Sequence, residues 1–335
     1  MRLGRFMEAR ARVRNPAMVL WRRALLRFVS SPAQATLVTW MANSGVGTDE
    51  TLKKGSLPLP VNFYSPVPDI DDLRRRRIWE RRSSLEGIAF QPKAQVEFMR
   101  RLGRAFGGEC AWPPDPTGND ADFYTENSSF SFACAAGTHC VIRDRKPKSV
   151  MEIGSGMSSL IISAALQANE ATGAARAAYT VIDPYPSPRL TTLPGTPATV
   201  VQRRVEEVEV GLFDQLGDGD VLFVDSGHVV RIGGDVNFLI LDVLPRLRPG
   251  VVVHFHDISL PFEYDEVYLT NPTFRMLWTE AYLLQAFLAH NAAYKVLLAM
   301  AFLEHDHQDV FREAFPRFDP TVHKLKSSSF WIARR

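Results

Sequence analysis

The stretch VMEIGSGMSSLIISAAL, residues 150–166, decides the fold of this chain. It begins as a buried-strand pattern that carries an acid, makes a Gly-Ser-Gly turn and restarts as an apolar helix. A strand, a turn and a helix in this order present backbone N–H groups and the positive end of a helix dipole to a ligand. The pattern predicts a ligand-binding turn at residues 154–156. The alternative is a purely structural turn, in which glycine serves only a positive φ.

The glycine spacing bears on which ligand this turn would bind. A dinucleotide fingerprint has the form G-x-G-x-x-G, and Ser159 stands where a third glycine would follow Gly154 and Gly156. This spacing disfavours NAD. Glu152, two residues before the first glycine, offers a carboxylate that could accept a hydrogen bond from a bound amine or organise the turn.

The next predicted strand, residues 178–182, ends at Asp183, 29 residues after Gly154. In a doubly wound sheet, an acid at this strand end faces the crevice where a ribose would lie. Its two oxygens can accept hydrogen bonds from both ribose hydroxyls. The sequence therefore predicts an adenosine-containing ligand.

Four segments together, VMEIGSG, TVIDPYP, LFVDSGH and VHFHDI, resemble the class I S-adenosylmethionine-dependent methyltransferases. Within that class the chain is similar to a bacterial subgroup with IDSSH and HDI-PFEY signatures, written here as FVDSGH (223–228) and HDISLPFEY (256–264). The resemblance runs from about residue 60 to the C-terminus and is most specific over residues 148–265.

The resemblance implies that S-adenosylmethionine is the cofactor. The residues expected to bind it are Glu152, Gly154, Ser155, Gly156, Ser158, Asp183 and Asp225. Glu152 and the two glycines would hold the methionine part, and Asp183 the ribose. Ser158 is a departure, since many class I enzymes have a third glycine there.

Strand and helix patterns alternate through the second half of the chain, which predicts an α/β fold with helices on both faces of a mostly parallel sheet. We expect a doubly wound, seven-stranded Rossmann-like sheet with an antiparallel C-terminal strand and an N-terminal helical extension. The predicted strands are 148–153, 178–183, 198–202, 220–225, 250–255, 295–303 and 327–334; the predicted helices are 92–107, 131–145, 158–170, 234–246 and 272–291.

Three segments are expected along the chain: a basic accessory arm (1–57), a cap on the substrate side (58–146) and the cofactor-binding methyltransferase domain (147–335). The first 30 residues hold eight arginines and one acid, while the remainder has 31 basic and 36 acidic residues. The main body is therefore not a nucleic-acid binder. Residues 1–30 could contact an anionic membrane surface peripherally, or form a packed or frayed extension. We expect a cytoplasmic protein, and residues 1–30 leave membrane association open.

Chemistry is expected where two predicted strands end. Asp225 and His228 follow one strand, and His256 and Asp257 follow another, so the two groups would meet across the crevice. Methyl transfer needs an aligned acceptor and removal of its proton. A histidine with an ordinary pKa of about 6.5 suits a general base at neutral pH, with Asp225 or Asp257 orienting it.

A metal-assisted version is the alternative. Catechol-type class I relatives bind magnesium with acids at these two strand ends, which would involve Asp225 and Asp257, but Ile258 stands where they supply an amide oxygen. We favour catalysis without a metal. His254, which alternates inward in its strand, is expected to be a core residue, and the sequence His305-Asp306-His307 is expected to be a solvated loop.

The leading hypothesis is an O-methyltransferase (EC 2.1.1.-) that acts on a hydroxyl of a small polyol, sugar or glycolipid, with a small-molecule or glycan acceptor as its partner. Two alternatives stay open: a non-catalytic, cofactor-binding scaffold and an NAD-dependent oxidoreductase. The three cysteines form no C-x-x-C pair and suggest neither a disulfide framework nor a zinc site.

Overall fold

The computed structural model describes residues 32–271, 275–323 and 326–335. The chain divides into two compact units, Met1–Arg77 and Ile78–Arg335. Most of the predicted basic arm lies outside the described residues, so its membrane contact stays a prediction, as do the predicted segment boundaries at 57/58 and 146/147. The first unit contains the helices α3 (Pro32–Ser44), α4 (Thr48–Lys53) and α5 (Ile70–Arg75), which confirms an N-terminal helical extension.

The second unit is built around one seven-stranded sheet with the order β3-β2-β1-β4-β5-β7-β6. The first five strands are parallel, and β7 runs antiparallel between β5 and β6. This confirms the predicted fold. The strands are β1 (Ser149–Ile153), β2 (Ala178–Ile182), β3 (Thr199–Val201), β4 (Val221–Val224), β5 (Val252–Phe255), β6 (Tyr294–Ala299) and β7 (Phe330–Arg334).

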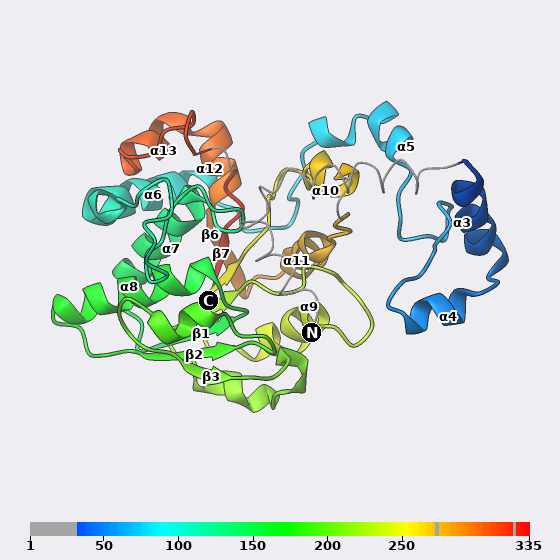
Figure 1. The fold of residues 1–335 in the computed structure, drawn as a ribbon. Helices are drawn as coiled ribbons and strands as arrows, with labels where there is room; N and C mark the ends of the chain where they lie inside the picture. Colours follow the sequence, from blue (N-terminus) through cyan, green and yellow to red (C-terminus); the bar gives the residue numbers. More distant parts are fainter. Residues whose placement is uncertain (1–31, 272–274, 324–325) are drawn as a thin grey trace. The chain divides into compact units, whose positions relative to one another are not determined.

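Helices cover both faces of the sheet (Figure 1). On one face lie α6 (Pro92–Phe106), α7 (Phe132–Arg145) and α8 (Met157–Ala171), with α7 packed on α8 and α6 on α13 (Gln308–Ala314). The other face carries α9 (Asp235–Asn237), continued by a π turn (Phe238–Val243) and a 3₁₀ turn (Leu244–Arg246), and α11 (Glu280–Leu288). Short α10 (Glu266–Thr270) and α12 (Met300–Asp306) complete the unit.

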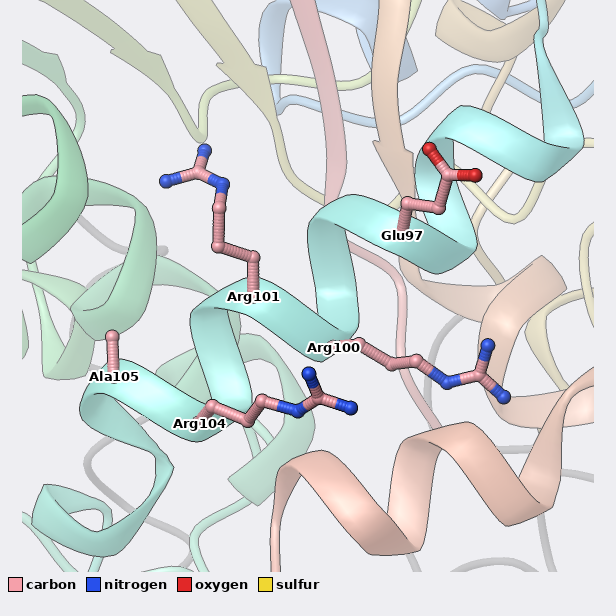
Figure 2. Close-up of a pocket in the computed structure, with 5 residues that line it drawn as sticks. All are labelled: Glu97, Arg100, Arg101, Arg104 and Ala105. Atoms are coloured by element: carbon pink, nitrogen blue, oxygen red, sulfur yellow. The ribbon is translucent and has the colours of Figure 1, made fainter.

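Helix α6 shows how the two sides of a surface helix differ. Met99 and Leu102 are fully buried, whereas Arg100, Arg101 and Arg104 line an open depression of about 420 Å³ (Figure 2). The three guanidinium groups are paired with acids on neighbouring helices: Arg101 with Asp144, and both Arg100 and Arg104 with Glu313. This depression contains none of the predicted site residues.

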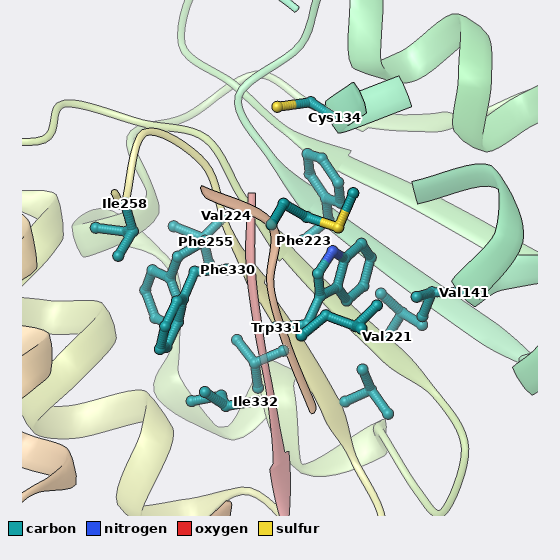
Figure 3. Packing of buried hydrophobic residues seen from close by; sticks show 14 of the residues in the cluster. Cys134, Val141, Val221, Phe223, Val224, Phe255, Ile258, Phe330, Trp331 and Ile332 are labelled. Carbon is teal, nitrogen blue, oxygen red and sulfur yellow. The ribbon is translucent and has the colours of Figure 1, made fainter. Parts of the chain in front are cut away.

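The centre of the core lies at β4, β5 and β7 (Figure 3). The His254 ring stacks on Phe223 with centroids 3.8 Å apart and packs against Trp331 at 4.6 Å. His254 is completely buried, and its Nε2 lies 2.9 Å from the Ser329 hydroxyl. Burial holds the pKa of His254 well below its ordinary value, so the ring is neutral. The prediction that His254 is a core residue is confirmed.

Three predictions near the C-terminus are wrong in their boundaries. Of the predicted helix 272–291, the described residues 275–291 are helical only over α11. The N–H groups of Met276 and Thr279 donate to the carbonyls of Tyr268 and His228 instead of starting a helix. The predicted strand 295–303 ends at Ala299, and α12 follows. The sequence His305-Asp306-His307 is not a loop: it forms the last turn and C-cap of α12, where Arg82 pairs with Asp306.

Within the described parts of the chain, no helix combines the length and the apolar character that crossing a bilayer would need.

The turn after β1 generates the first prediction. Gly154 has φ +89°, and a Cβ built there would lie 2.0 Å from the carbonyl oxygen of Asp225. Gly154→Ala should lower the free energy of unfolding by about 1–3 kcal/mol or more, since backbone strain and a backbone clash add. Urea unfolding followed by circular dichroism measures this.

Gly156→Ala is the matched control, because a Cβ there meets nothing within 4 Å. Equal losses of stability in the two variants would contradict the close approach of Gly154 to β4.

Candidate active site

The turn at residues 154–156 connects β1 to α8 at the middle of the sheet. The Gly154 N–H donates to the Ile182 carbonyl of β2, and the Asp225 N–H after β4 donates to the Ile153 carbonyl. The ends of β2, β1 and β4 are therefore tied together by backbone hydrogen bonds. Around Gly156 the space where a side chain would lie is open. A ligand can approach the start of α8 there.

Glu152 points into the fold under this turn. Its carboxylate is completely buried and accepts hydrogen bonds from Ser158 Oγ at 2.7 Å, from Ser159 Oγ at 2.8 Å and from the Tyr179 hydroxyl. Burial raises the pKa of Glu152 to about 7, although these hydroxyl donors act in the opposite direction. Glu152 and Ser158, both predicted to bind the cofactor, thus bind each other and brace the first turn of α8.

Asp183 and Ser155 join the loops that follow β1 and β2. Asp183 Oδ2 accepts from Ser155 Oγ at 2.5 Å, and its Oδ1 accepts from the Tyr185 N–H at 2.7 Å. Ser155 Oγ in turn accepts from the Ser187 N–H at 2.8 Å. An ionised carboxylate has about four lone-pair sites, so Asp183 keeps acceptor capacity for further hydroxyl groups. Its place at the end of β2 agrees with the position predicted for a ribose ligand.

Three predicted catalytic side chains meet in one cluster. His228 Nε2 lies 3.4 Å from Asp225 Oδ1 and 3.6 Å from Asp257 Oδ2. His228 and Asp257 both have left-handed backbone conformations, with φ of 55° and 58°. Such conformations are costly outside glycine and are found at sites where the surrounding structure enforces them. The cluster lies beyond β4 and β5, directly after the Asp225 carbonyl that contacts the glycine turn.

His256, the fourth predicted catalytic residue, faces the same two carboxylates with its Nδ1, whereas His228 faces them with its Nε2. The His256 Nδ1 lies 3.4 Å from Asp225 Oδ1 and 3.4 Å from Asp257 Oδ2. Its Nε2 lies 3.4 Å from the hydroxyl of Ser328, which also donates to Asp257 at 2.9 Å. His256 is 4% exposed and His228 6%, so the two rings are buried to nearly the same extent.

Glu280 is the main residue that sequence reasoning missed. Its Oε2 lies 2.9 Å from His228 Nδ1, and the side chain is almost fully buried. The backbone N–H groups of Thr279 and Glu280 also donate to the His228 carbonyl. The available signal was an acid on the buried stripe of a helix that continues with Leu284 and Leu288. Glu280 fixes the ring so that Nε2 is directed to Asp225 and Asp257.

The charges of the cluster depend on one another. Burial alone would lower the pKa of His228, but Asp225, Glu280 and Asp257 outweigh it and raise the pKa to about 10. In the same way Asp257 and Asp225 raise the pKa of His256 well above its ordinary value. The two histidines lower the pKa of Asp225 and of Asp257 despite their burial. The ordinary histidine pKa assumed from the sequence therefore does not apply to His228.

The same atoms have the geometry of a possible cation site. One ligand atom from each of Asp225, His228 and Asp257 lies within 4.8 Å of the other two. Two oxygens and an imidazole nitrogen suit divalent transition metals better than magnesium, which prefers oxygen ligands. A carboxylate on the second ring nitrogen, here Glu280, is the usual support of a metal-binding histidine. Among the described residues, His305, Asp306 and His307 form no such cluster.

Comparison with known proteins identifies the family. Residues 151–258, which include the glycine turn and all four predicted catalytic residues, match the family described as a methyltransferase domain. Residues 151–258 therefore belong to a methyltransferase-domain family, which agrees with the resemblance to the class I S-adenosylmethionine-dependent methyltransferases. A relative from Archaeoglobus fulgidus, an uncharacterized protein, is 30% identical over 169 residues; the match covers 48% of this methyltransferase and 75% of the relative.

Solved structures give more distant matches. The O-methyltransferase TomG from Streptomyces achromogenes, solved with S-adenosylmethionine, is 14% identical, with a TM-score of 0.38 and coverage of 71% of this chain and 89% of its own. Podospora anserina PaMTH1, solved with S-adenosylhomocysteine, is 19% identical, with a TM-score of 0.35 and coverage of 82% and 100%. These likenesses are too low to carry further argument about the site.

The environment of Glu152 generates the second prediction. Its folded pKa of about 7 lies above the ordinary 4.5, so the folded state binds its proton more tightly than the unfolded state. This contribution to stability is complete below pH 4.5 and is lost as the pH rises through 7. In Glu152→Gln that component should be missing. Urea unfolding of both proteins at pH 5 and pH 8, without ligand, measures the difference.

If the wild type and Glu152→Gln lose the same amount of stability between these two pH values, the buried carboxylate does not titrate as described. Glu207→Gln, at an exposed carboxylate in the 3₁₀ turn after β3, is the control for the same exchange on the surface.

Proposed function

We propose that this methyltransferase transfers a methyl group from S-adenosylmethionine to a hydroxyl oxygen of a small acceptor. One observation carries the proposal: the backbone of the glycine turn lies against the residue that begins the acid and imidazole cluster. A site for an adenosine-containing cofactor and a site for proton transfer would thus share one wall, Gly154 against Asp225. In-line transfer requires donor and acceptor to be held at such short range.

The residues at the ends of β1 and β2 fit the cofactor. Asp183 would accept hydrogen bonds from the ribose hydroxyls, while Ser155 and the open turn at Gly156 would face the methionine part. Glu152 and Ser158 would act indirectly, since they hold the first turn of α8 in place. When bound, the cofactor supplies a methyl group on a positively charged sulfur.

The cluster beyond β4 and β5 would receive the acceptor and its proton. His228 Nε2 is the candidate proton acceptor, and Glu280 is its positioning residue. An imidazolium cannot accept a proton, so His228 must first release to solvent the proton that its neighbours stabilise. A positive charge bound beside the cluster favours this loss, because like charges repel.

The second candidate mechanism uses a divalent cation held by Asp225, His228 and Asp257. It is favoured because one ligand atom from each of these residues lies within 4.8 Å of the other two. There His228 would be a neutral ligand, and the acceptor hydroxyl would lose its proton more easily beside the positive charge. The same chain residues would serve in both versions.

The third prediction concerns Asp183. Asp183→Ala should weaken binding of S-adenosylmethionine about tenfold to a hundredfold, the loss expected for one or two hydrogen bonds to a charged group. Isothermal titration calorimetry measures the affinity. Asp214→Ala, a surface carboxylate paired with Arg246, is the matched control and should bind as the wild type does. Binding of NAD in place of S-adenosylmethionine would support an oxidoreductase and refute the proposal.

The fourth prediction concerns proton transfer. His228→Ala should lower kcat by about a hundredfold or more, which is the usual contribution of acid–base catalysis, and should not weaken cofactor binding. Glu280→Gln should lower kcat less, since the ring stays but its orientation weakens. Methyl transfer from labelled cofactor measures both. His307→Ala is the histidine control outside the cluster.

Full activity in His228→Ala would exclude its role, and absence of transfer from every acceptor would favour a non-catalytic scaffold. Dialysis against EDTA separates the two mechanisms: loss of activity that Mn²⁺ restores supports the cation, and unchanged activity supports catalysis without a metal.

A further inference from the structure

A second cavity lies beside the candidate active site and has no assigned role. It has a volume of about 260 Å³ and is formed by the start of the second unit, the loop after β5 and helix α11. Its polar and aromatic lining includes Arg81, Ser83, Glu263, Tyr264, Tyr282 and Gln285. All of these residues belong to the same compact unit as the cluster.

The cavity shares walls with the catalytic cluster. Ser259, on one wall, follows Asp257 by two residues, and Ala281, on another, follows Glu280 directly. The Tyr264 ring, between them, packs edge-on against Trp278 at 6.0 Å, and Trp278 lies 4.7 Å from the His228 ring. Two aromatic rings in succession, Tyr264 and Trp278, thus lie between a molecule in the cavity and His228.

The polar groups in the cavity are held in place by hydrogen bonds, but some of their donor and acceptor atoms remain available to a ligand. Glu263 Oε1 accepts from the Tyr264 N–H at 2.9 Å and from the Tyr282 hydroxyl, and Gln285 Nε2 donates to Ser83 Oγ at 2.5 Å. Across the described residues, Glu263 Oε2, Gln285 Oε1 and the Arg81 guanidinium have no hydrogen-bond partner. These groups offer two acceptors and a set of donors in one small space.

This combination suits a polyhydroxylated ring. Hydroxyl groups both donate and accept, so they can satisfy a carboxylate, an amide oxygen and a guanidinium together. The Tyr282 ring, half exposed, provides a flat surface for the C–H face of such a ring. The volume is slightly below the range of about 300–1,000 Å³ for drug-sized ligands, which fits one ring and not a long chain.

We infer that this cavity binds a sugar-type ring of the acceptor and so sets acceptor specificity. The inference rests on the proposed methyl transfer, because it assigns the acceptor of that reaction. In this arrangement Glu263 and Gln285 bind ring hydroxyls, Tyr282 packs on the ring, and Arg81 favours a ring that carries a carboxylate.

The test is ligand-observed NMR on the full chain, with methyl glycosides of neutral hexoses and of hexuronic acids as probes. Tyr282→Ala and Gln285→Ala should each weaken binding roughly three- to tenfold, the loss of a ring contact or a hydrogen bond. Gln308→Ala, an exposed glutamine on α13, should bind as the wild type does. Tyr282 is half exposed, so its variant keeps the test valid if Gln285→Ala unfolds.

The outcomes separate the cavity from the reaction. No binding of any glycoside, or equal losses in the Gln308→Ala control, overturns the cavity assignment even if the cofactor binds and methyl transfer occurs elsewhere. Binding that depends on Tyr282 and Gln285 supports the assignment. It does so whether or not the bound glycoside is methylated, because the rings of Tyr264 and Trp278 lie between the cavity and His228. Stronger binding of hexuronic acids than of hexoses, lost in Arg81→Ala, would support the role of Arg81.

Discussion

The structure depends on the contact between Gly154 and the carbonyl of Asp225. Neighbouring parallel strands β1 and β4 lie where the strand order reverses, and each strand end carries a different group of polar residues. Only a residue without a side chain lets the two backbones approach so closely. The hydrogen bond from the Asp225 N–H to the Ile153 carbonyl fixes the register of the two strands. A crevice outside the carboxyl ends of the strands at such a reversal is the common place for a ligand in open α/β sheets.

Around this contact the chain gathers buried and half-buried titratable side chains. Three carboxylates and two imidazoles lie within short range of one another, all on segments that follow β4 or β5 or begin α11. Burial penalises each charge, and only mutual pairing makes the group tolerable. The same arrangement favours protonated histidines in the free protein. A bound positive charge, either the cofactor's sulfur or a divalent metal ion, would favour loss of the proton from His228.

The loop after β5 and helix α11 link the cluster to the cavity of about 260 Å³. One end of each segment supports the cluster, through Asp257 and Glu280, and the following residues line the cavity of about 260 Å³. The cavity proposed for the acceptor and the cluster proposed for catalysis are therefore built from the same two pieces of chain. Under this proposal, changes in either piece would affect specificity and catalysis together.

The sequence by itself determined the sheet, the glycine turn and the acids at the strand ends, because hydrophobic alternation and turn residues are local patterns. It also determined that Asp183, Asp225 and Asp257 would lie at one edge, since parallel strands end together. The sequence could not determine that Glu152 and Ser158 turn inward, that Glu280 reaches His228 over 52 residues, or that residues 275–279 stay outside a helix. Only tertiary structure decided these, because each depends on which buried groups find hydrogen-bond partners from distant segments, and on the pKa shifts that such burial and pairing produce.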